Sequence, residues 1–177
     1  MKIAIIGYSG AGKSTLAEKL SNYYSIPKLH MDTLQFQPGW QDSDRDWMEA
    51  EMKNFLSEHT NWVIEGNYSW CYYEERMWEA DQIIFLNFSP LPCLFRAFKR
   101  YLTYRGKVRE SMAAGCPERF NWEFIRWILW DGRTKIAKER YQWLQETYPE
   151  KVIVLRSQKE IDHFLENLAH NEKNQRT

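Results

Sequence analysis

The residues most suited to chemistry form a glycine-rich loop near the start of the chain. The run GYSGAGKS, residues 7–14, fits the pattern G-x-x-x-x-G-K-[ST] at every fixed position. Glycines let backbone N–H groups approach phosphate oxygens, and the positive end of a following helix favours an anion. In this pattern Lys13 reaches the β- and γ-phosphates of a nucleoside triphosphate, and Ser14 is a ligand of Mg²⁺. The predicted nucleotide-binding residues are Gly7, Ser9, Gly10, Ala11, Gly12, Lys13, Ser14 and Thr15.

Two acidic residues, Asp32 and Glu65, each follow an apolar run that reads as a strand. Ligands of open α/β sheets gather at such strand ends. In a phosphoryl-transfer site one carboxylate serves the Mg²⁺ shell, and the other holds or deprotonates the acceptor. We assign Ser14 and Glu65 to the metal and Asp32 to the acceptor, although position alone also allows the reverse. His30 is more typical of a hydrogen-bonded, half-buried side chain than of a base.

The net charge of zero hides a strong separation of charge along the chain. The 24 Lys and Arg balance 24 Asp and Glu, which excludes a uniformly basic nucleic-acid coat and an acidic tail. Residues 91–140 nevertheless carry twelve basic against five acidic residues, and residues 40–82 carry three against eleven. Positive donors stabilise a transferring phosphoryl group, and a lid supplies them when it closes. The basic residues that we expect to contact phosphate are Arg100, Arg105 and Arg109.

Short apolar runs alternate with amphipathic stretches, which predicts a parallel α/β sheet in a single domain. Strands are expected over residues 2–6, 26–30, 62–65, 82–88 and 151–155. Helices are expected over residues 13–24, 42–59, 70–79, 90–104, 121–147 and 160–168. Residues 105–120 show no clean period and are the predicted lid. The predicted domain covers residues 1–168, and residues 169–177 are expected to form a flexible tail.

Cysteine spacing and hydropathy suggest the cellular setting. The three cysteines are far apart and lack C-x-x-C spacing, so neither a disulfide framework nor a zinc site is indicated. No apolar run approaches the roughly 18 residues needed to span a bilayer. The apolar run at the N-terminus is too short for the core of a signal peptide. We therefore expect a cytoplasmic protein with no membrane partner.

Several short motifs, taken in chain order with the phosphate loop, resemble those of one family. They are KLHMD at 28–32, PGW at 38–40, WVIEGNY at 62–68, ADQIIFL at 80–86, YRGK at 104–107 and GCPERF at 115–120. Together they resemble bacterial adenylate-kinase-related proteins known as DNA topology-modulation (FlaR-type) proteins, over nearly the whole chain.

The resemblance implies a fold, a cofactor and further site residues. The implied fold is a three-layer α/β P-loop kinase fold, with helices on both faces of a five-stranded parallel sheet of order 2-3-1-4-5 and a short lid. The implied activity is that of an ATP-binding kinase. By position in the family motifs, the residues facing the acceptor would be Asp32, Glu65, Asn67 and Arg76, and Arg156 would border the adenine.

Two functions remain open at this point. The first is a kinase that transfers the γ-phosphate of ATP to a nucleotide or another small molecule, and the absence of an N-K-x-D motif argues against a GTPase. The second is a regulatory protein that binds nucleotide or DNA and affects DNA topology with little or no kinase activity. The basic block and the nearby Trp122, Trp127 and Trp130 favour it. Because these tryptophans are more typical of a helix-packing core or a homodimer contact, nucleic acid is not favoured and the kinase leads.

Overall fold

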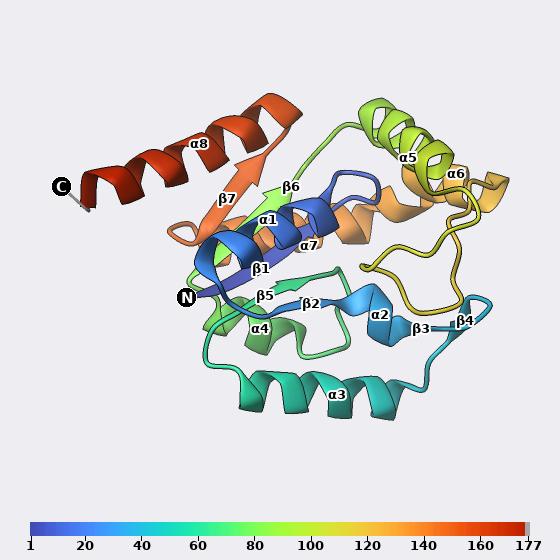
Figure 1. Ribbon diagram of the computed structural model, residues 1–177, viewed down its shortest axis with the longest axis horizontal. Helices are drawn as coiled ribbons and strands as arrows, with labels where there is room; N and C mark the ends of the chain where they lie inside the picture. The colour runs from blue at the N-terminus through green and yellow to red at the C-terminus, as the bar shows by residue number, and fades with distance from the viewer. Residues whose placement is uncertain (176–177) are drawn as a thin grey trace.

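The computed structural model describes the backbone of residues 1–175 and the side chains of residues 1–170, and a five-stranded parallel sheet forms its centre. The strands of the sheet are β1 (Lys2–Gly7), β2 (Lys28–His30), β5 (Trp62–Glu65), β6 (Gln82–Leu86) and β7 (Val152–Leu155). They lie in the order β2-β5-β1-β6-β7 (Figure 1). This is the predicted order 2-3-1-4-5, so the predicted fold class is confirmed.

Helices cover both faces of this sheet. The longer helices of the chain are α1 (Lys13–Tyr24), α3 (Arg45–Glu58), α4 (Tyr73–Glu79), α5 (Pro90–Tyr104), α6 (Trp122–Leu129), α7 (Lys135–Thr147) and α8 (Gln158–Gln175). Of these, α5 and α6 pack on each other beyond the carboxyl ends of the strands (Figure 1). Figure 1 shows α1 in front of the sheet and α7 behind it. The sheet is therefore the middle of three layers, as expected for strands that are apolar on both faces.

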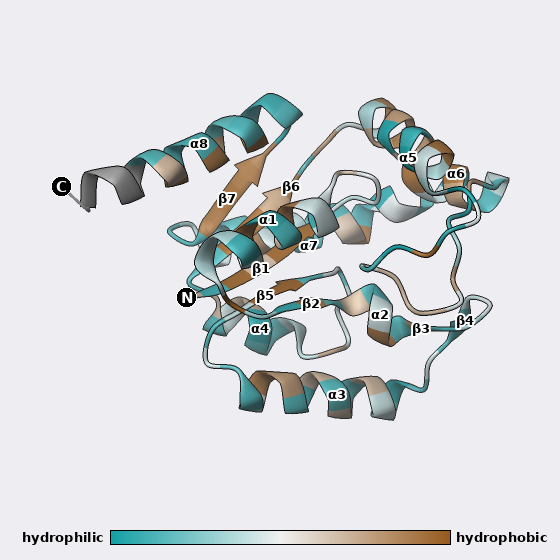
Figure 2. Cartoon of the chain, viewed as in Figure 1, coloured by the Kyte–Doolittle hydropathy of each residue, from teal (hydrophilic) through white to brown (hydrophobic). Residues whose placement is uncertain are grey.

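The core lies between these layers. The residues of β1 from Ile3 to Ile6 are at most 1% exposed, and in Figure 2 the brown apolar colour is concentrated on β1, β6 and β7. On the α7 side, the ring of Phe85 in β6 stacks on Tyr141 with the ring centroids 4.2 Å apart. Burial of these apolar side chains holds the strand ends, and hence the loops that follow them, at one edge of the sheet.

The predicted helix over residues 121–147 is wrong, because two helices share this stretch. Asn121 caps α6 by accepting the Phe124 N–H at 3.0 Å. A 3₁₀ turn, Asp131–Arg133, then separates α6 from α7. Thr134 is the N-cap of α7, and its hydroxyl accepts the Ala137 N–H at 3.2 Å. Apolar residues recur at helical spacing on both sides of the turn, so this spacing alone does not reveal that a second helix starts at the Thr134 N-cap.

A short helix and a small hairpin follow β2 and were not predicted. The helix is α2 (Met31–Gln35), and the hairpin pairs β3 (Phe36–Gln37) with β4 (Gln41–Asp42) in an antiparallel ladder. The turn between them places Gly39 at φ +79° and Trp40 at φ +65°. The helix expected from residue 42 begins at Arg45 instead, because Asp44 caps it by accepting the Trp47 N–H. The hairpin matters below because it forms one wall of the site.

The C-terminal helix is longer than predicted. Helix α8 continues to Gln175, past residue 168, where we expected the closing helix to end. The predicted flexible tail covers residues 169–177. Helix α8 includes residues 169–175, and residues 176 and 177 lie outside the described residues. No described helix is both long and apolar enough to cross a membrane.

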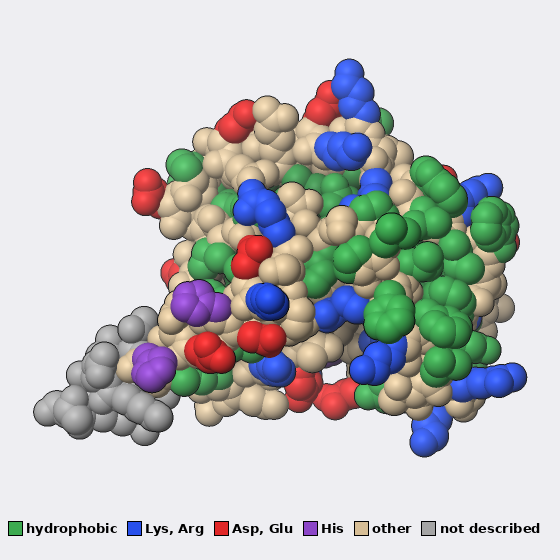
Figure 3. All heavy atoms as spheres, turned by 90° about the horizontal axis from the view of Figure 1, so that it is seen from above, with side chains coloured by type: hydrophobic (Ala, Val, Ile, Leu, Met, Phe, Trp, Pro, Cys, Tyr) green, Lys and Arg blue, Asp and Glu red, His purple; other side chains and the backbone are tan. Residues whose placement is uncertain are grey.

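Helices α5 and α6 carry an exposed apolar surface. Trp122, Trp127 and Trp130 are 66%, 50% and 58% exposed, so the interpretation of these residues as core is wrong. On α5 the side chains of Leu91, Phe95, Phe98 and Leu102 are also exposed. Figure 3 shows apolar side chains gathered on this side of the molecule, beside a hollow bordered by basic and acidic side chains. Residues of α5 and α6, among them Phe95, Arg96 and Trp127, line the cavity of the candidate site.

Candidate phosphoryl-transfer site

A cavity of about 990 Å³ lies beyond the carboxyl ends of the central strands. Its walls come from the phosphate loop, α2 and the hairpin, the loop after β5, α5, the predicted lid and the start of α6. The predicted site residues that line it are Ser9, Gly10, Gly12, Lys13, Ser14, Thr15, Asp32, Glu65, Asn67, Arg100 and Arg109. The volume is that of a site for a nucleotide-sized ligand.

The phosphate loop joins β1 to α1, and its glycines are required by its shape. Gly10 and Gly12 have φ values of +82° and +101°, which favour glycine. A Cβ on Gly10 would lie 2.5 Å from the carbonyl oxygen of Cys93 in α5, and one on Gly12 would collide with the guanidinium of Arg96. Gly7 and Ala11 belong to the loop but do not line the cavity.

Two polar residues hold this loop from outside. The Arg96 Nε donates to the Gly10 carbonyl oxygen at 3.2 Å, and sequence reasoning did not select this arginine from the basic block. The side-chain amide of Asn67 accepts the Gly7 N–H at 3.0 Å and donates to the Gly7 carbonyl oxygen at 2.6 Å. Asn67 was predicted to bind substrate, but both ends of its amide are engaged by the loop, so its contact here is with the backbone of the phosphate loop.

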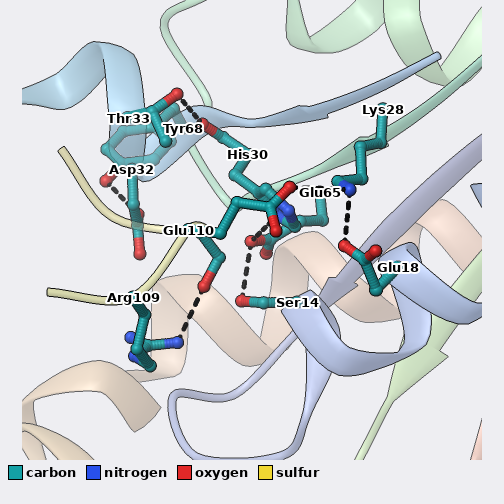
Figure 4. A network of polar contacts seen from close by, with 11 residues as sticks. Ser14, Glu18, Lys28, His30, Asp32, Thr33, Glu65, Tyr68, Arg109 and Glu110 are labelled. Carbon is teal, nitrogen blue, oxygen red and sulfur yellow. Dashed lines mark hydrogen bonds and ion pairs between the residues drawn. The ribbon is translucent and has the colours of Figure 1, made fainter. Parts of the chain in front are cut away.

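Ser14 and Glu65, the two residues predicted to hold the metal, are in contact in the structure. The Ser14 hydroxyl donates to Glu65 Oε1 at 2.9 Å, and His30 Nδ1 lies 3.0 Å from the same oxygen (Figure 4). Burial acts to raise the pKa of Glu65, but the hydrogen bond from His30 and the positive charge of Lys13 outweigh it and hold the pKa below its usual value. The lowered pKa favours the ionised form of Glu65. His30 is 5% exposed and bonded, as expected of a structural histidine.

The Ser14–Glu65 pair fits Mg²⁺ in the chemistry of its donors. Mg²⁺ takes oxygen ligands and is usually held by one or two carboxylates together with substrate phosphates and water. A hydroxyl and an ionised carboxylate lie together here, next to the lysine of the phosphate loop. Within the described residues there is no cluster of three His, Cys, Asp or Glu that could hold a metal by itself. Phosphate oxygens would have to complete such a shell.

Asp32, in α2, also lines the cavity, and its surroundings differ from those of Glu65. The Tyr68 hydroxyl donates to Asp32 Oδ1 at 2.6 Å (Figure 4). Burial and the nearby negative charge of Glu65 raise the pKa of Asp32 above its usual value. The two carboxylates thus have opposite tendencies, which suits one for a metal and the other for proton transfer.

The structure brings together two of the three arginines predicted to contact phosphate. Arg100 from α5 and Arg109 from the lid both line the cavity and both bind Glu118. Arg105 is exposed and does not line the cavity. Arg156 is also exposed and outside the cavity lining, and its backbone N–H donates to Glu160. The sequence did not predict a role for Glu118, because its neighbours in the chain do not indicate that Arg100 and Arg109 are its partners.

The predicted lid, residues 105–120, lies against the hairpin without forming a helix or a strand. The Gly39 N–H donates to the Gly115 carbonyl oxygen at 3.0 Å, and the Trp40 indole N–H donates to the Pro117 carbonyl oxygen at 3.2 Å. The guanidinium of Arg119 lies over the Trp40 ring, 4.0 Å from its centroid. These contacts close the cavity on the side of the hairpin.

Arg76 does not face the acceptor as predicted. The side chain is fully buried, and its three nitrogens donate to four backbone carbonyl oxygens. Those carbonyls belong to Gly66, Tyr68, Cys71 and Tyr72, in and just after the loop that follows β5. Burial lowers the pKa of Arg76 to about 10. Arg76 therefore shapes the loop that presents Asn67 and Tyr68, and its guanidinium is engaged by the backbone.

We expect Arg76→Ala to destabilise the fold. The substitution leaves buried carbonyl oxygens without donors and opens a cavity, so the free energy of unfolding should fall by about 3–5 kcal/mol. Urea denaturation followed by circular dichroism measures this change. The matched control is Arg105→Ala, which removes an exposed arginine and should leave the unfolding midpoint unchanged. A loss of stability no larger than that of the control would contradict this role for Arg76.

Comparisons with known proteins agree with the fold and go no further. No family model matches the sequence, and no curated protein matches it. A gluconokinase from Sinorhizobium meliloti 1021 is similar in structure, with 18% identity, a TM-score of 0.50, and coverage of 98% of this chain and 96% of that chain. A shikimate kinase from Bacteroides thetaiotaomicron has 18% identity, coverage of 98% of both chains and a TM-score of 0.49. The likeness to the gluconokinase, together with the strand order and the phosphate loop, shows that this chain has the P-loop kinase fold.

Proposed function

We propose that this protein is a kinase that transfers the γ-phosphoryl group of ATP to a nucleotide or another small molecule. The observation that carries the proposal is the convergence of Lys13, Ser14, Glu65 and Asp32 in one cavity with the arginine pair at its lid. Phosphoryl transfer needs little covalent chemistry from a protein, so positioning and charge stabilisation supply most of the rate. The cavity brings together the groups for both.

The donor end of the cavity is built to hold a triphosphate. Residues of the phosphate loop and of the start of α1 line this end, and their backbone N–H groups and Lys13 would contact the phosphates. Ser14 and Glu65 would hold Mg²⁺, which supplies neutralisation of phosphate charge when it is bound. Arg100 and Arg109 would donate to the oxygens of the transferring group, where negative charge has to be stabilised.

The acceptor end centres on Asp32. Its carboxylate would accept a hydrogen bond from an acceptor hydroxyl and take up its proton as that oxygen bonds to the γ-phosphorus. The bond from the γ-phosphorus to the β–γ bridging oxygen would break in the same step, with ADP as the leaving group. The raised pKa of Asp32 makes its carboxylate a better base than an exposed aspartate. Tyr68 keeps the carboxyl group in place through the hydroxyl contact at 2.6 Å.

Aromatic side chains surround this end and support an acceptor that contains a ring. Phe36 and Trp40 of the hairpin pack edge to face with centroids 5.2 Å apart, and Tyr68 and Trp70 do the same at 6.3 Å. All four line the cavity. Aromatic walls favour flat rings over open polyols, which supports a nucleotide over a sugar acid such as the acceptor named for the gluconokinase.

The contacts of the basic block weaken the nucleic-acid alternative. Most of its arginines are bound within the chain: Arg96 to Gly10 and Gln158, Arg100 and Arg109 to Glu118, Arg119 to Trp40, Arg126 to Asp131, and Arg133 to Ile128 and Phe88. A surface that binds a polyanion needs several free cations along it. Arg100 and Arg109 keep free donors, but these two arginines line the cavity, which suits a small phosphate-bearing ligand. The order of motifs along the chain still supports membership of the FlaR-type family, and we include that membership in the proposal.

The test is release of ADP by the purified wild-type protein with MgATP and a panel of acceptors. The panel contains nucleosides, nucleoside monophosphates, gluconate and shikimate. We expect at least one ring-containing acceptor to raise ADP release well above the rate without acceptor, and chelation of Mg²⁺ with EDTA to abolish this increase. ATP binding without any acceptor-dependent ADP release would argue for the regulatory alternative.

A further inference from the structure

The lid carries a buried carboxylate, Glu118, that connects two segments of the cavity wall. Its side chain is 4% exposed. Oε2 accepts a hydrogen bond from Arg100 Nε in α5 at 3.0 Å, and Oε1 accepts one from Arg109 Nε in the lid. The Glu118 N–H also donates to the Lys107 carbonyl oxygen at 3.2 Å, which closes the lid loop on itself. One residue thus joins the lid to α5.

The atoms used in these contacts leave both Nη atoms of Arg100 and the Nη2 atom of Arg109 available. Each arginine meets Glu118 through Nε. Arg109 Nη1 donates to the Ser111 hydroxyl at 2.8 Å, and the Nη atoms of Arg100 form no hydrogen bond with the described residues. The Nη ends are the donors that bind phosphate oxygens in pairs. Glu118 therefore holds the arginines by the one nitrogen that they need least for phosphate.

The charges favour this arrangement. Two guanidinium groups in one wall repel each other, and the pKa of Arg100 is lowered first by burial and then by the charge of Arg109. Glu118 opposes this repulsion and leaves one net positive charge for an incoming anion. The carboxylate of Glu118 is buried with both oxygens bonded, so the two contacts with arginine offset the free-energy cost of its desolvation.

We propose that Glu118 is a positioning residue for phosphoryl transfer, which sets Arg100 and Arg109 side by side before the nucleotide arrives. The inference rests on the proposed function, since it concerns the same cavity. Without Glu118 both arginines keep their charge but lose their shared anchor. The two positive charges should then still attract the bound nucleotide, but the guanidinium groups should no longer be aligned with the oxygens of the transferring phosphoryl group.

The first experiment is steady-state kinetics of Glu118→Gln, a variant of nearly equal size. We expect kcat to fall about 10- to 100-fold, with KM for MgATP within about threefold of wild type. A purely structural role would lower the melting temperature and the amount of folded enzyme without this split. The matched control is Glu110→Gln, an exposed lid carboxylate paired with Lys28 at 3.0 Å, which should keep wild-type kcat. Wild-type kcat in Glu118→Gln would overturn the proposal.

The second experiment asks whether Glu118 acts through the arginines. In an Arg100→Ala, Arg109→Ala background, Glu118→Gln should change kcat by less than about twofold, because residues acting as one unit are not additive. Retention of its full effect in that background would show that Glu118 acts elsewhere and would refute the positioning role.

The third experiment does not depend on turnover. Amide hydrogen exchange of residues 105–120 should be at least about tenfold faster in Glu118→Gln than in wild type, because the lid loses its anchor on α5. Equal exchange rates overturn the inference, whatever the kinetics. Absence of acceptor-dependent ADP release in the wild type overturns the kinase proposal instead, so the two failures are distinguishable.

Discussion

Lys13→Ala is expected to lower kcat by at least about 10³-fold, because a phosphoryl-transfer site that loses a cation at the β- and γ-phosphates loses stabilisation where the charge is greatest. The fold should survive the change. Among the described side chains, Lys13 Nζ makes only a long hydrogen bond of 3.5 Å, to the Tyr8 carbonyl oxygen. We therefore expect little change in the melting temperature of the ligand-free protein.

The measurement is ADP release with saturating MgATP and the best acceptor of the panel, combined with thermal melting by circular dichroism. The matched control is Lys19→Ala, an exposed lysine on the same helix that does not line the main cavity. The control should keep wild-type kcat. If Lys13→Ala kept more than a tenth of the wild-type rate, the nucleotide would have to bind elsewhere and the proposed function would fail.

Asp32→Asn is expected to have the second-largest effect. The amide has nearly the same shape but cannot take up a proton, and general base catalysis typically contributes 10²–10⁴-fold. We expect kcat to fall by about 10²-fold or more while KM for MgATP changes less than about threefold, because Asp32 lies at the acceptor end. The Tyr68 hydroxyl can still donate to the remaining carbonyl oxygen of the asparagine, so the local fold is retained.

The same ADP-release assay tests this prediction with two comparisons. Asp42→Asn changes an exposed carboxylate of the hairpin that binds Gln35 at 2.9 Å, and it should leave kcat unchanged. Glu65→Gln should instead weaken the response to Mg²⁺, which a titration of the metal at fixed ATP would show. An Asp32→Asn enzyme with normal kcat would exclude Asp32 as the base and leave Glu65 as the candidate.

Much of the fold and of the donor end follows from local sequence patterns. The strand at β1, the phosphate loop and the start of α1 are contiguous, so their type and spacing encode the site directly. Glu65 and Asp32 could also be selected, because the ends of parallel strands meet at one edge of a sheet and their positions along the chain are readable. The prediction of one helix over residues 121–147 was wrong, because an N-cap at Thr134 is a weak signal beside apolar residues that keep their helical spacing on both sides of it.

The sequence by itself determined the sheet order through the resemblance, the nucleotide loop through its spacing, and the separation of charge between the acceptor-side stretch and the lid. Only the tertiary structure decided the partner of each charged side chain. Arg76, Arg100 and Arg105 are chemically identical in the sequence, yet one is buried against backbone carbonyls, one binds Glu118 in the cavity wall, and one is exposed. The physical reason is that burial and hydrogen bonding depend on residues far apart in the chain, which packing brings together and local spacing does not encode.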